Sequence, residues 1–582
     1  MANTTIDPNI LKRAQAWLSD SNIDEETKSR ISSMIENDPA ELAESFYCDL
    51  EFGTGGLRGI MGDGTNRMNK YTVGMATQGL ANYLKKVFAA ENEIRIAIAY
   101  DCRNNSSYFS NIVADVLSAN GIVVYLFKEL RPTPELSFAV RYLHCHSGIM
   151  VTASHNPKEY NGYKVYWNDG AQLVPPHDKN VITEVQKIAS IGDVNFIGDP
   201  MKINMLDETI DNEFLRISKT YSLAPEVIAP AKNMKIVFTP LHGTGITMVP
   251  QGLRSYGFEN IHIVEKQAVS DGNFPTVVSP NPEEKAAMKM AMELAREINA
   301  DLVLATDPDA DRIGVGVKDT DGNYILLNGN QTAALLTYYL IKQWEAKGKL
   351  KGNEYIVKTI VTSELISAIA KGAGVEYFDV LTGFKWIAEV IRNLEGTKTF
   401  IGGGEESYGF MIGDFVRDKD AVTACCIFAE CAAWAASKGK SLYELLLDIY
   451  LEYGLYKENL VNVVKKGMSG QAEIKAMMEG FRANPPKEIA GSKVKLMNDF
   501  ELRKAIDISS GKVTAIELPK SDVLQFFLED GTKISMRPSG TEPKIKFYFS
   551  VRTDLKSAAD FKNTEARLDG RIEEIIVAMG LK

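Results

Sequence analysis

The sequence predicts a multidomain α/β protein, and three observations lead to this prediction. Apolar runs of about four to eight residues alternate with helical patterns through most of the 582-residue chain. Clusters of polar residues follow several of these runs, at the point where each would end as a strand. The stretch from about residue 456 differs and indicates an α+β arrangement. Length alone allows roughly three to five domains.

Buried strands are predicted where the apolar runs are continuous, because a sheet covered by helices on both faces has no polar side. The predicted strands are 94–99, 122–127, 148–151, 235–238, 261–264, 302–305, 355–360, 376–381 and 399–401. Residues 1 to about 45 show an amphipathic pattern that predicts an N-terminal helical extension. From about 456 onward the predicted order is helix, strands, helix.

Composition argues against some classes of protein. The net charge of −11 argues against a nucleic-acid partner, and any anionic substrate would need local cations. The N-terminus lacks the pattern of a signal peptide, and the apolar stretch 421–436 contains Glu430 and predicts a buried helix. We therefore expect no membrane partner. The six cysteines show no CxxC spacing, which predicts reduced thiols and a cytoplasmic location.

Three carboxylates follow the predicted strand 302–305 in the segment Asp-Pro-Asp-Ala-Asp-Arg. Pro308 disfavours a helix, so Asp307, Asp309 and Asp311 can converge on a cation, and Mg²⁺ prefers such oxygen ligands. An EF-hand begins similarly, but it needs glycine and glutamate at its sixth and twelfth positions, where this chain has arginine and lysine. A solvated acidic loop is the other interpretation, and the strand that enters the loop favours a metal site.

A serine lies in the polar turn at 152–157 (Thr-Ala-Ser-His-Asn-Pro), directly after the predicted strand 148–151. Taken alone, Ser154 in such a turn is more often a helix cap than a nucleophile, and His155 is more often structural. The Gly-x-Ser-x-Gly elbow of acyl-transfer enzymes is absent. Lys164 is either a solvated lysine or a proton carrier whose pKa is lowered by a nearby cation.

Two turns rich in glycine, serine and threonine carry an arginine each, at 52–59 with Arg58 and at 537–541 with Arg537. Backbone N–H groups, hydroxyls and a guanidinium together suit a phosphate. Glu405 and Ser407 follow three glycines and offer an acceptor and a donor to adjacent sugar hydroxyls. Each of these segments in isolation is also compatible with an ordinary turn.

Four segments, at 152–157, 307–312, 404–409 and 537–543, resemble in this order the motifs of the α-D-phosphohexomutases. The segment at 52–59 and the N-terminal helices are most similar to the phosphoglucomutase/phosphopentomutase branch. The resemblance covers residues 40–582 and implies four domains around a central cleft, three with a mixed α/β sandwich core and one C-terminal α+β domain. The expected parts are a helical extension at 1–45 and domains at 46–207, 208–322, 323–455 and 456–582.

The resemblance also implies roles for individual residues. Ser154 matches the serine that carries the phosphoryl group, and with Asp307, Asp309 and Asp311 it would bind Mg²⁺. Arg58 and Lys164 match basic residues beside the reacting phosphate, and His155 is a further candidate for proton transfer. The residues expected to bind substrate are Arg312, Lys358, Lys385, Glu405, Ser407, Arg537, Ser539, Gly540 and Thr541.

The implied reaction interconverts glucose 1-phosphate and glucose 6-phosphate through a phosphoserine, with glucose 1,6-bisphosphate as intermediate and activator. Dual-specificity relatives carry a histidine shortly after the sugar-binding serine, whereas Tyr408 and Gly409 follow here, which argues against mannose. The alternatives are a phosphopentomutase, a phosphomannomutase or glucosamine mutase, a bisphosphate synthase, a metal-dependent phosphatase and a non-catalytic sugar-phosphate sensor. The expected partners are small-molecule sugar phosphates, and the expected state is a monomer or a dimer.

Overall fold

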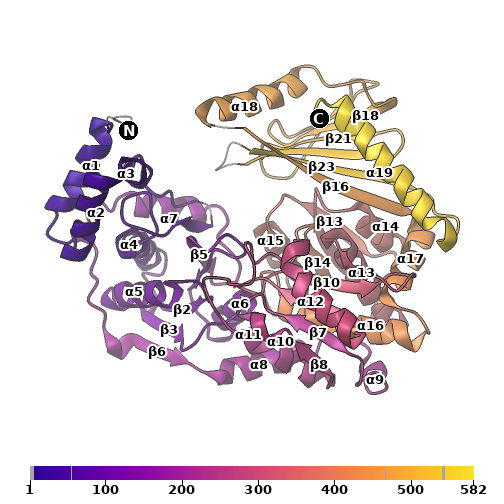
Figure 1. Cartoon of the computed structure of the whole chain (residues 1–582), viewed down its shortest axis with the longest axis horizontal. Coiled ribbons are helices and arrows are strands. Elements are labelled where there is room, and N and C mark those ends of the chain that lie inside the picture. The colour runs from indigo at the N-terminus through magenta and orange to yellow at the C-terminus, as the bar shows by residue number, and fades with distance from the viewer. Residues whose placement is uncertain (1–5, 54, 466, 540–543) are drawn as a thin grey trace.

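The computed structural model of the chain describes residues 6–53, 55–465, 467–539 and 544–582, and in these it contains four sheets flanked by helices (Figure 1). The first three sheets mix parallel and antiparallel strands and succeed one another along the chain. The fourth consists of antiparallel strand pairs. The predicted α/β class with a distinct C-terminal α+β domain is confirmed.

Three helices form the N-terminal extension: α1 (Pro8–Ser19), α2 (Glu25–Asn37) and α3 (Pro39–Phe46). The ring of Trp17 meets Phe46 and Tyr71 edge-on, with centroids 5.7 and 5.4 Å away. Tyr71 belongs to α4 (Lys70–Val87), so this aromatic cluster attaches the extension to the helices of the first sheet (Figure 1).

The first sheet has the strand order β1-β5-β4-β2-β3-β6, in which β2, β3, β4 and β6 are parallel. Every residue of β4 is buried, as its continuous apolar sequence predicts. The strand β5 was not predicted, because its Asn-Gly beginning resembles a turn. The strands are β1 (Gly56–Ile60), β2 (Arg95–Tyr100), β3 (Val123–Phe127), β4 (Ser147–Val151), β5 (Tyr160–Trp167) and β6 (Ile203–Leu206). The helices that follow α4 are α5 (Ser106–Ala119), α6 (Thr133–Tyr142) and α7 (His177–Val185), with 3₁₀ turns at Ile191–Asp193 and Pro200–Lys202.

The second sheet has the order β11-β10-β9-β7-β8, and β10 folds back antiparallel on β9 after the acidic loop. Its strands are β7 (Ile236–Thr239), β8 (Ile261–Ile263), β9 (Leu302–Thr306), β10 (Ile313–Lys318) and β11 (Tyr324–Leu327). The sheet therefore runs past the boundary expected at residue 322. Its helices are α8 (Glu208–Lys219), α9 (Pro225–Ile228), α10 (Gly245–Tyr256), α11 (Glu265–Ala268) and α12 (Lys285–Ile298).

The third sheet has the order β13-β12-β14-β15. Its strands are β12 (Glu354–Thr359), β13 (Glu376–Val380), β14 (Thr399–Gly404) and β15 (Phe410–Ile412), and its helices are α13 (Gly329–Ala346), α14 (Glu364–Gly372), α15 (Phe384–Leu394), α16 (Ala421–Ser437) and α17 (Leu442–Tyr453). The helix α16 is buried along almost its whole length, which confirms the prediction for 421–436. Within the described residues, no single helix has the length and apolarity to cross a membrane; α16 and α17 pass that test only as a pair, with a bend of 81° between them.

The fourth sheet begins with a strand, so the predicted order of helix, strands, helix was wrong in its first element. This strand, β16 (Leu455–Val464), pairs along ten residues with β23 (Lys544–Thr553), a partner that lies far away in sequence. The helices α18 (Gly467–Ala483) and α19 (Phe561–Ala578) follow β16 and β23, and a 3₁₀ turn lies at Ala558–Asp560. The remaining strands are β17 (Glu488–Ile489), β18 (Ser492–Asp499), β19 (Lys504–Asp507), β20 (Val513–Ala515), β21 (Leu524–Leu528) and β22 (Lys533–Pro538).

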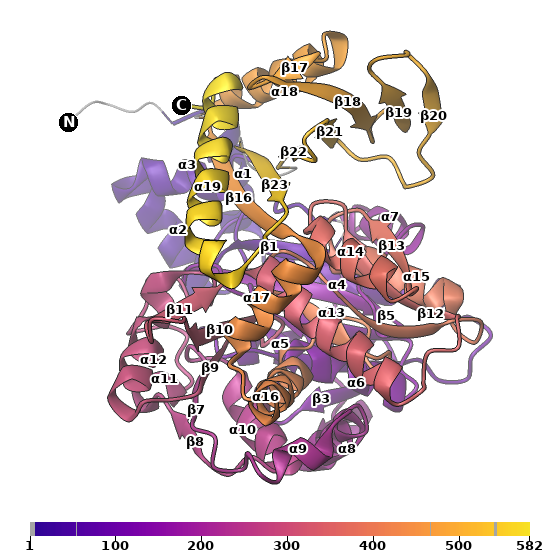
Figure 2. The same cartoon turned by 90° about the vertical axis from the view of Figure 1, so that its right-hand side faces the viewer.

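Buried polar contacts attach the fourth sheet to the third, which lies below it in Figure 2. Lys533 Nζ on β22 donates to Thr362 O at 3.0 Å and pairs with Glu364 Oε1 at 2.6 Å. Lys358, which is fully buried, pairs with the same carboxylate at 3.1 Å and with Asp379 at 2.6 Å. We call these four charged residues, Lys358, Glu364, Asp379 and Lys533, the docking cluster.

Candidate active site

Ser154 lies in a strained turn at the carboxyl end of β4. Its backbone adopts a left-handed conformation with φ of 53°, which is unfavourable for a residue with a side chain. The buried guanidinium of Arg103 holds the turn by donating to Ser154 O at 2.6 Å and Pro157 O at 2.8 Å. Ser154 N donates to Thr152 Oγ1, which donates to Asp101 Oδ2. The turn therefore presents the hydroxyl of Ser154 and does not cap a helix with it.

The acidic loop follows β9, and all three of its aspartates are buried. The loop after β7 packs against the acidic loop. Thr244 N donates to Pro308 O at 2.8 Å, and Gly243 approaches so closely that an added Cβ would lie 2.3 Å from Pro308 Cα. Glycine is therefore required at position 243, and the acidic loop rests on a rigid neighbour.

The serine and the acidic loop meet directly. Ser154 Oγ donates to Asp307 Oδ2 at 2.7 Å, and His155 Nδ1 lies 3.1 Å from the same hydroxyl. Lys164 Nζ on β5 pairs with Asp309 Oδ2 at 2.7 Å and with Asp311 Oδ2 at 3.6 Å. The structure thus brings the predicted nucleophile, the predicted acidic triad and both candidate proton carriers together, across the boundary between the first two sheets.

The acidic triad has the donor set of a divalent-cation site. One carboxylate oxygen from each of Asp307, Asp309 and Asp311 lies within 4.8 Å of the others. Asp309 Oδ1 and Asp311 Oδ1 are buried and have no hydrogen-bond donor among the described residues. Buried carboxylate oxygens without donors are unfavourable, and hard cations such as Mg²⁺ bind such oxygens. Burial together with the charges of Asp311 and Asp309 raises the pKa of Asp307 well above its usual range, as expected for an excess of negative charge.

The two candidate proton carriers differ in charge. Burial and the cations Arg312 and Arg58 lower the pKa of His155 well below its usual value, so its ring is neutral at pH 7. Burial also disfavours the charge of Lys164, but the carboxylates of Asp309 and Asp311 outweigh it and raise its pKa. In this structure Lys164 is an ammonium that balances the triad.

The sequence analysis missed Lys419. This buried ammonium lies 2.9 Å from Asp311 Oδ2 and 3.2 Å from Asp418 Oδ1, and Asp418 also accepts from Tyr166 OH on β5 at 2.7 Å. Lys419 precedes α16, whose first N–H group (Ala421) donates to Ala310 O in the acidic loop at 3.2 Å. The available signal was the charged run at 417–420 directly before an apolar helix.

Asp420, the N-cap of α16, should give the protein a measurable pH dependence of stability. Burial raises its pKa to about 6, while the bond from Thr423 N opposes this shift. Between about pH 4 and pH 6 the folded chain keeps a proton that the unfolded chain releases, so stability falls as the pH rises through this window and stays lower above it. Asp420→Asn keeps the cap and removes the charge. We expect it to raise stability at pH 8 by about 1–3 kcal/mol and to have little effect at pH 4.

Thermal unfolding midpoints of the wild type and the Asn variant at both pH values test this expectation. Asp207 caps α8 in the same way through Thr209 N but lies at the surface, so Asp207→Asn is the matched control and should give no gain at pH 8. Equal effects of Asp420→Asn at pH 4 and pH 8 would contradict the assignment.

The predicted sugar-binding loop follows β14. Glu405 is buried, and its Oε1 accepts from Gly383 N at 2.9 Å, while Ser407 Oγ lies 3.4 Å from Oε2. Burial raises the pKa of Glu405, although the charge of Lys419 opposes it. The neighbouring Glu406 accepts from the hydroxyls of Thr359 at the end of β12 and Thr362 in the following loop, each at 3.1 Å. The loop is therefore held at both acidic residues.

The other predicted residues lie in different surroundings. Arg58 is exposed on β1, in register with Gly162 of β5. Arg312 donates its backbone N–H to Asp307 Oδ1 at 3.1 Å, and its guanidinium pairs with Glu283. Lys385 lies in the first turn of α15 with its ammonium 5.2 Å from the ring of Trp386. The substrate contacts assigned to these side chains stay predictions.

The predicted substrate-binding residues Lys358 and Arg537 lie on β12 and β22. The ammonium of Lys358 is fully buried and paired within the docking cluster, so in this structure its charge serves the packing of the third and fourth sheets. Arg537 is the second-to-last residue of β22, and Ser539 N donates to Lys544 O at 2.7 Å. Gly540 and Thr541 lie outside the described residues. The substrate-binding roles of all five residues stay predictions.

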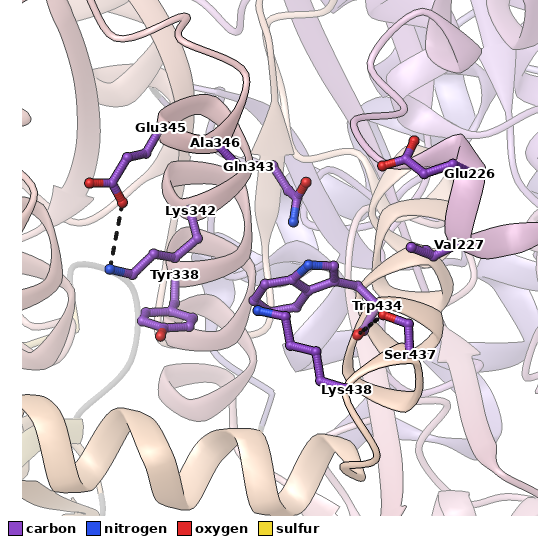
Figure 3. Close-up of a pocket in the computed structure, with 10 residues that line it drawn as sticks. All are labelled: Glu226, Val227, Tyr338, Lys342, Gln343, Glu345, Ala346, Trp434, Ser437 and Lys438. Atoms are coloured by element: carbon purple, nitrogen blue, oxygen red, sulfur yellow. Dashed lines mark hydrogen bonds and ion pairs between the residues drawn. The ribbon is translucent and has the colours of Figure 1, made fainter.

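A surface pocket of about 670 Å³ lies elsewhere, between α9, α13 and α16 (Figure 3). Lys342 pairs there with Glu345, and the ammonium of Lys438 lies 3.7 Å from the ring of Trp434. None of its lining residues belongs to the predicted motifs. The ammonium groups of Lys342 and Lys438 therefore already interact with side chains of the protein itself.

A serine hydroxyl held against a buried acidic triad that could bind a cation, at the strand ends of two α/β domains, is the arrangement that metal-assisted phosphoryl transfer requires. Models of the phosphoglucomutase/phosphomannomutase family match the chain in four parts: alpha/beta/alpha domain I at residues 49–191, domain II at 218–322, domain III at 328–453 and the C-terminal domain at 482–568. The chain belongs to this family, and it is an isomerase of the phosphohexomutase type.

Curated relatives agree with this assignment, and solved structures share the fold. The chain is 38% identical over 540 residues to a phosphoglucomutase of Staphylococcus haemolyticus, covering 90% of this chain and 95% of the relative. It is 40% identical over 520 residues to a phosphoglucomutase of Staphylococcus aureus strain USA300, covering 88% and 91%. The fold is similar to that of pp63/parafusin, a phosphoglucomutase from Paramecium in its open form, with a TM-score of 0.64, 16% identity and coverage of 91% and 96%. It is also similar to a putative phosphomannomutase from Thermus thermophilus, with a TM-score of 0.63, 21% identity and coverage of 90% and 99%.

Proposed function

We propose that this enzyme interconverts glucose 1-phosphate and glucose 6-phosphate through a phosphoserine at Ser154 and a glucose 1,6-bisphosphate intermediate. The observation that carries the proposal is the 2.7 Å contact between Ser154 Oγ and Asp307 Oδ2, because it supports a role for this hydroxyl as the nucleophile beside the acidic triad. We propose glucose as the sugar because relatives at 38–40% identity are named phosphoglucomutases.

Ser154 and the three aspartates would hold Mg²⁺. The bound ion supplies charge neutralisation for the transferring phosphoryl group. The suitability of these residues for Mg²⁺ is supported by two buried carboxylate oxygens, which have no hydrogen-bond donor among the described residues. Lys164 and Lys419 add two ammonium groups at the same carboxylates. They lower the electrostatic cost of bringing an anionic substrate to a protein of net charge −11.

The chain's own residues orient the substrate for transfer. The loop that begins at Arg537 binds the phosphate that is already on the sugar, and Glu405 with Ser407 binds adjacent hydroxyls. The O6 atom of glucose 1-phosphate forms a bond to the phosphorus of phosphoserine as the Ser154 Oγ–P bond breaks. His155, whose ring is neutral, lies beside the serine and can take the O6 proton. Lys164 could do so only after losing the proton that makes it an ammonium at Asp309.

The second half of the reaction returns the phosphoryl group. The bisphosphate turns end for end, and Ser154 Oγ forms a bond to the phosphorus at C1 as the O1–P bond breaks. The proton removed from O6 in the first half is returned to O1, and glucose 6-phosphate leaves. Arg537 serves both orientations because a guanidinium binds a phosphate regardless of the carbon that carries it. The phosphoserine is regenerated, so the net reaction consumes no phosphate.

Coupled assays with glucose 1-phosphate, ribose 1-phosphate and mannose 1-phosphate side by side test the proposal. We expect kcat/KM for glucose 1-phosphate to exceed the others by at least about tenfold, which corresponds to about 1.4 kcal/mol of differential binding of the transition state. Mass spectrometry of the Ser154 peptide after incubation with glucose 1,6-bisphosphate should show one added phosphoryl group. A larger kcat/KM for ribose 1-phosphate would identify a phosphopentomutase, and stoichiometric release of inorganic phosphate would identify a phosphatase.

A further inference from the structure

A residue of α6 contacts the acidic loop from the first sheet's side. Thr133 N donates to Asp309 O at 2.9 Å, and Thr133 Oγ1 donates to Asp309 Oδ2 at 2.9 Å. Both residues are fully buried. A single threonine therefore fixes the backbone and the side chain of one member of the triad, across the boundary between the first two sheets.

The position of Thr133 is itself fixed by its neighbours. Pro132 and Pro134 have restricted φ angles and carry no N–H group, so Thr133 supplies the one backbone donor of this tripeptide. Arg131 anchors the segment on one side, because its N–H donates to Tyr100 O at 3.1 Å and its Nε to Asp211 Oδ1 at 2.9 Å. The hydroxyl of Thr133 thus reaches Asp309 from a rigid support.

The hydrogen bonds divide the two oxygens of Asp309 into separate roles. Oδ2 accepts from both Thr133 Oγ1 and Lys164 Nζ, at 2.9 and 2.7 Å. Oδ1 is buried and has no donor among the described residues. Two donors on one oxygen restrict rotation of the carboxylate and leave Oδ1 as the oxygen of Asp309 that a cation could bind.

We propose that Thr133 is a positioning residue that presents Asp309 Oδ1 to the divalent cation. The inference rests on the metal site of the proposed function. Lys164 also holds this carboxylate, but it carries a charge, and its removal would change the electrostatics of the site. Thr133 is neutral, so loss of its hydroxyl changes the orientation of Asp309 and leaves the charge balance intact. Removal of such a supporting hydrogen bond weakens metal binding by about 10- to 100-fold in other proteins.

The test measures Mn²⁺ binding by calorimetry to full-length, dephosphorylated protein without sugar phosphate. Thr133→Val removes the hydroxyl and keeps the shape and the backbone N–H. We expect it to raise the Kd for Mn²⁺ by about tenfold. Thr133→Ser keeps the donor and should bind Mn²⁺ with nearly the wild-type Kd. Thr133→Ala is a second variant without the hydroxyl, for use if the valine variant does not fold.

A matched control tests whether the loss of a buried hydroxyl elsewhere in the protein also weakens Mn²⁺ binding. Thr332 is equally buried in α13, and its Oγ1 donates to Asn328 O within the same helix at 3.0 Å, so Thr332→Val should keep the wild-type Kd. A folded Thr133→Val or Thr133→Ala protein with the wild-type Kd would overturn this inference and leave the metal site intact. A serine variant as weak as the valine variant would overturn it too. A wild-type protein that binds no Mn²⁺ would overturn both this inference and the metal site of the proposed function.

Discussion

Replacement of Ser154 by alanine is expected to lower kcat at least about a thousandfold, because it removes the atom that carries the phosphoryl group. The turn itself should persist. Arg103 bonds the carbonyl oxygen of Ser154, and Thr152 accepts from its backbone N–H, and alanine retains both groups. A lower kcat would therefore result from the missing hydroxyl and not from a misfolded turn. The measurements are a coupled assay with glucose 1,6-bisphosphate present and mass spectrometry of the peptide that contains residue 154.

Ser437→Ala is a suitable control for this variant. Ser437 is exposed at the end of α16, and its hydroxyl donates to Trp434 O in the preceding turn, so activity should be unchanged. Full turnover by Ser154→Ala would show that another group carries the phosphoryl, and the proposed mechanism would then be wrong.

Glu364→Gln is expected to destabilise the protein by about 2–3 kcal/mol, since it leaves two buried ammonium groups short of a counter-charge. Lys533 is 4% exposed and Lys358 fully buried, and both pair with this carboxylate at 2.6 and 3.1 Å. The side chain of Glu364 is itself 34% exposed, so we place the effect below that for a fully buried pair. Glutamine has nearly the same shape, so the change isolates the charge. Urea unfolding midpoints of variant and wild type measure the effect.

The third sheet offers a matched surface pair for comparison. Glu376 pairs with Lys398 where the two side chains are 46% and 33% exposed, so Glu376→Gln should cost at most about 1 kcal/mol. If Glu364→Gln is no more destabilising than Glu376→Gln, the docking cluster does not stabilise the contact between the third and fourth sheets.

The buried strands were predictable from sequence because their signal is local. Nine continuous apolar runs were predicted as strands, and each coincides with an observed strand, from β2 to β14, within one to three residues at its ends. Where the signal depended on a distant partner, prediction failed. The strand β16 mixes polar and apolar residues without a continuous apolar run, and it pairs with β23, which lies far away in sequence. The strand β5 contains Asn161-Gly162 directly after its first residue, and this pair locally resembles a turn.

In the candidate site, too, residues in local motifs were predicted and residues that act through distant contacts were not. Ser154 and the acidic triad were predicted because each stands in a compact motif directly after a strand. Lys419 and Thr133 were missed because each acts on the acidic loop from a different sheet or helix. Lys358 was predicted as a substrate contact, and the structure finds its charge paired within the docking cluster.

The amino-acid order by itself determined the α/β class, the positions of most strands, and which residue types could carry a phosphoryl group or a cation. These properties follow from periodicity and from chemistry within a few neighbouring residues. Only the tertiary structure decided which of those groups meet. The contact of Ser154 with Asp307 spans 153 positions, and that of Thr133 with Asp309 spans 176. Such distances are closed by the packing of whole sheets, whose free energy is distributed over many buried side chains and is not contained in any short motif.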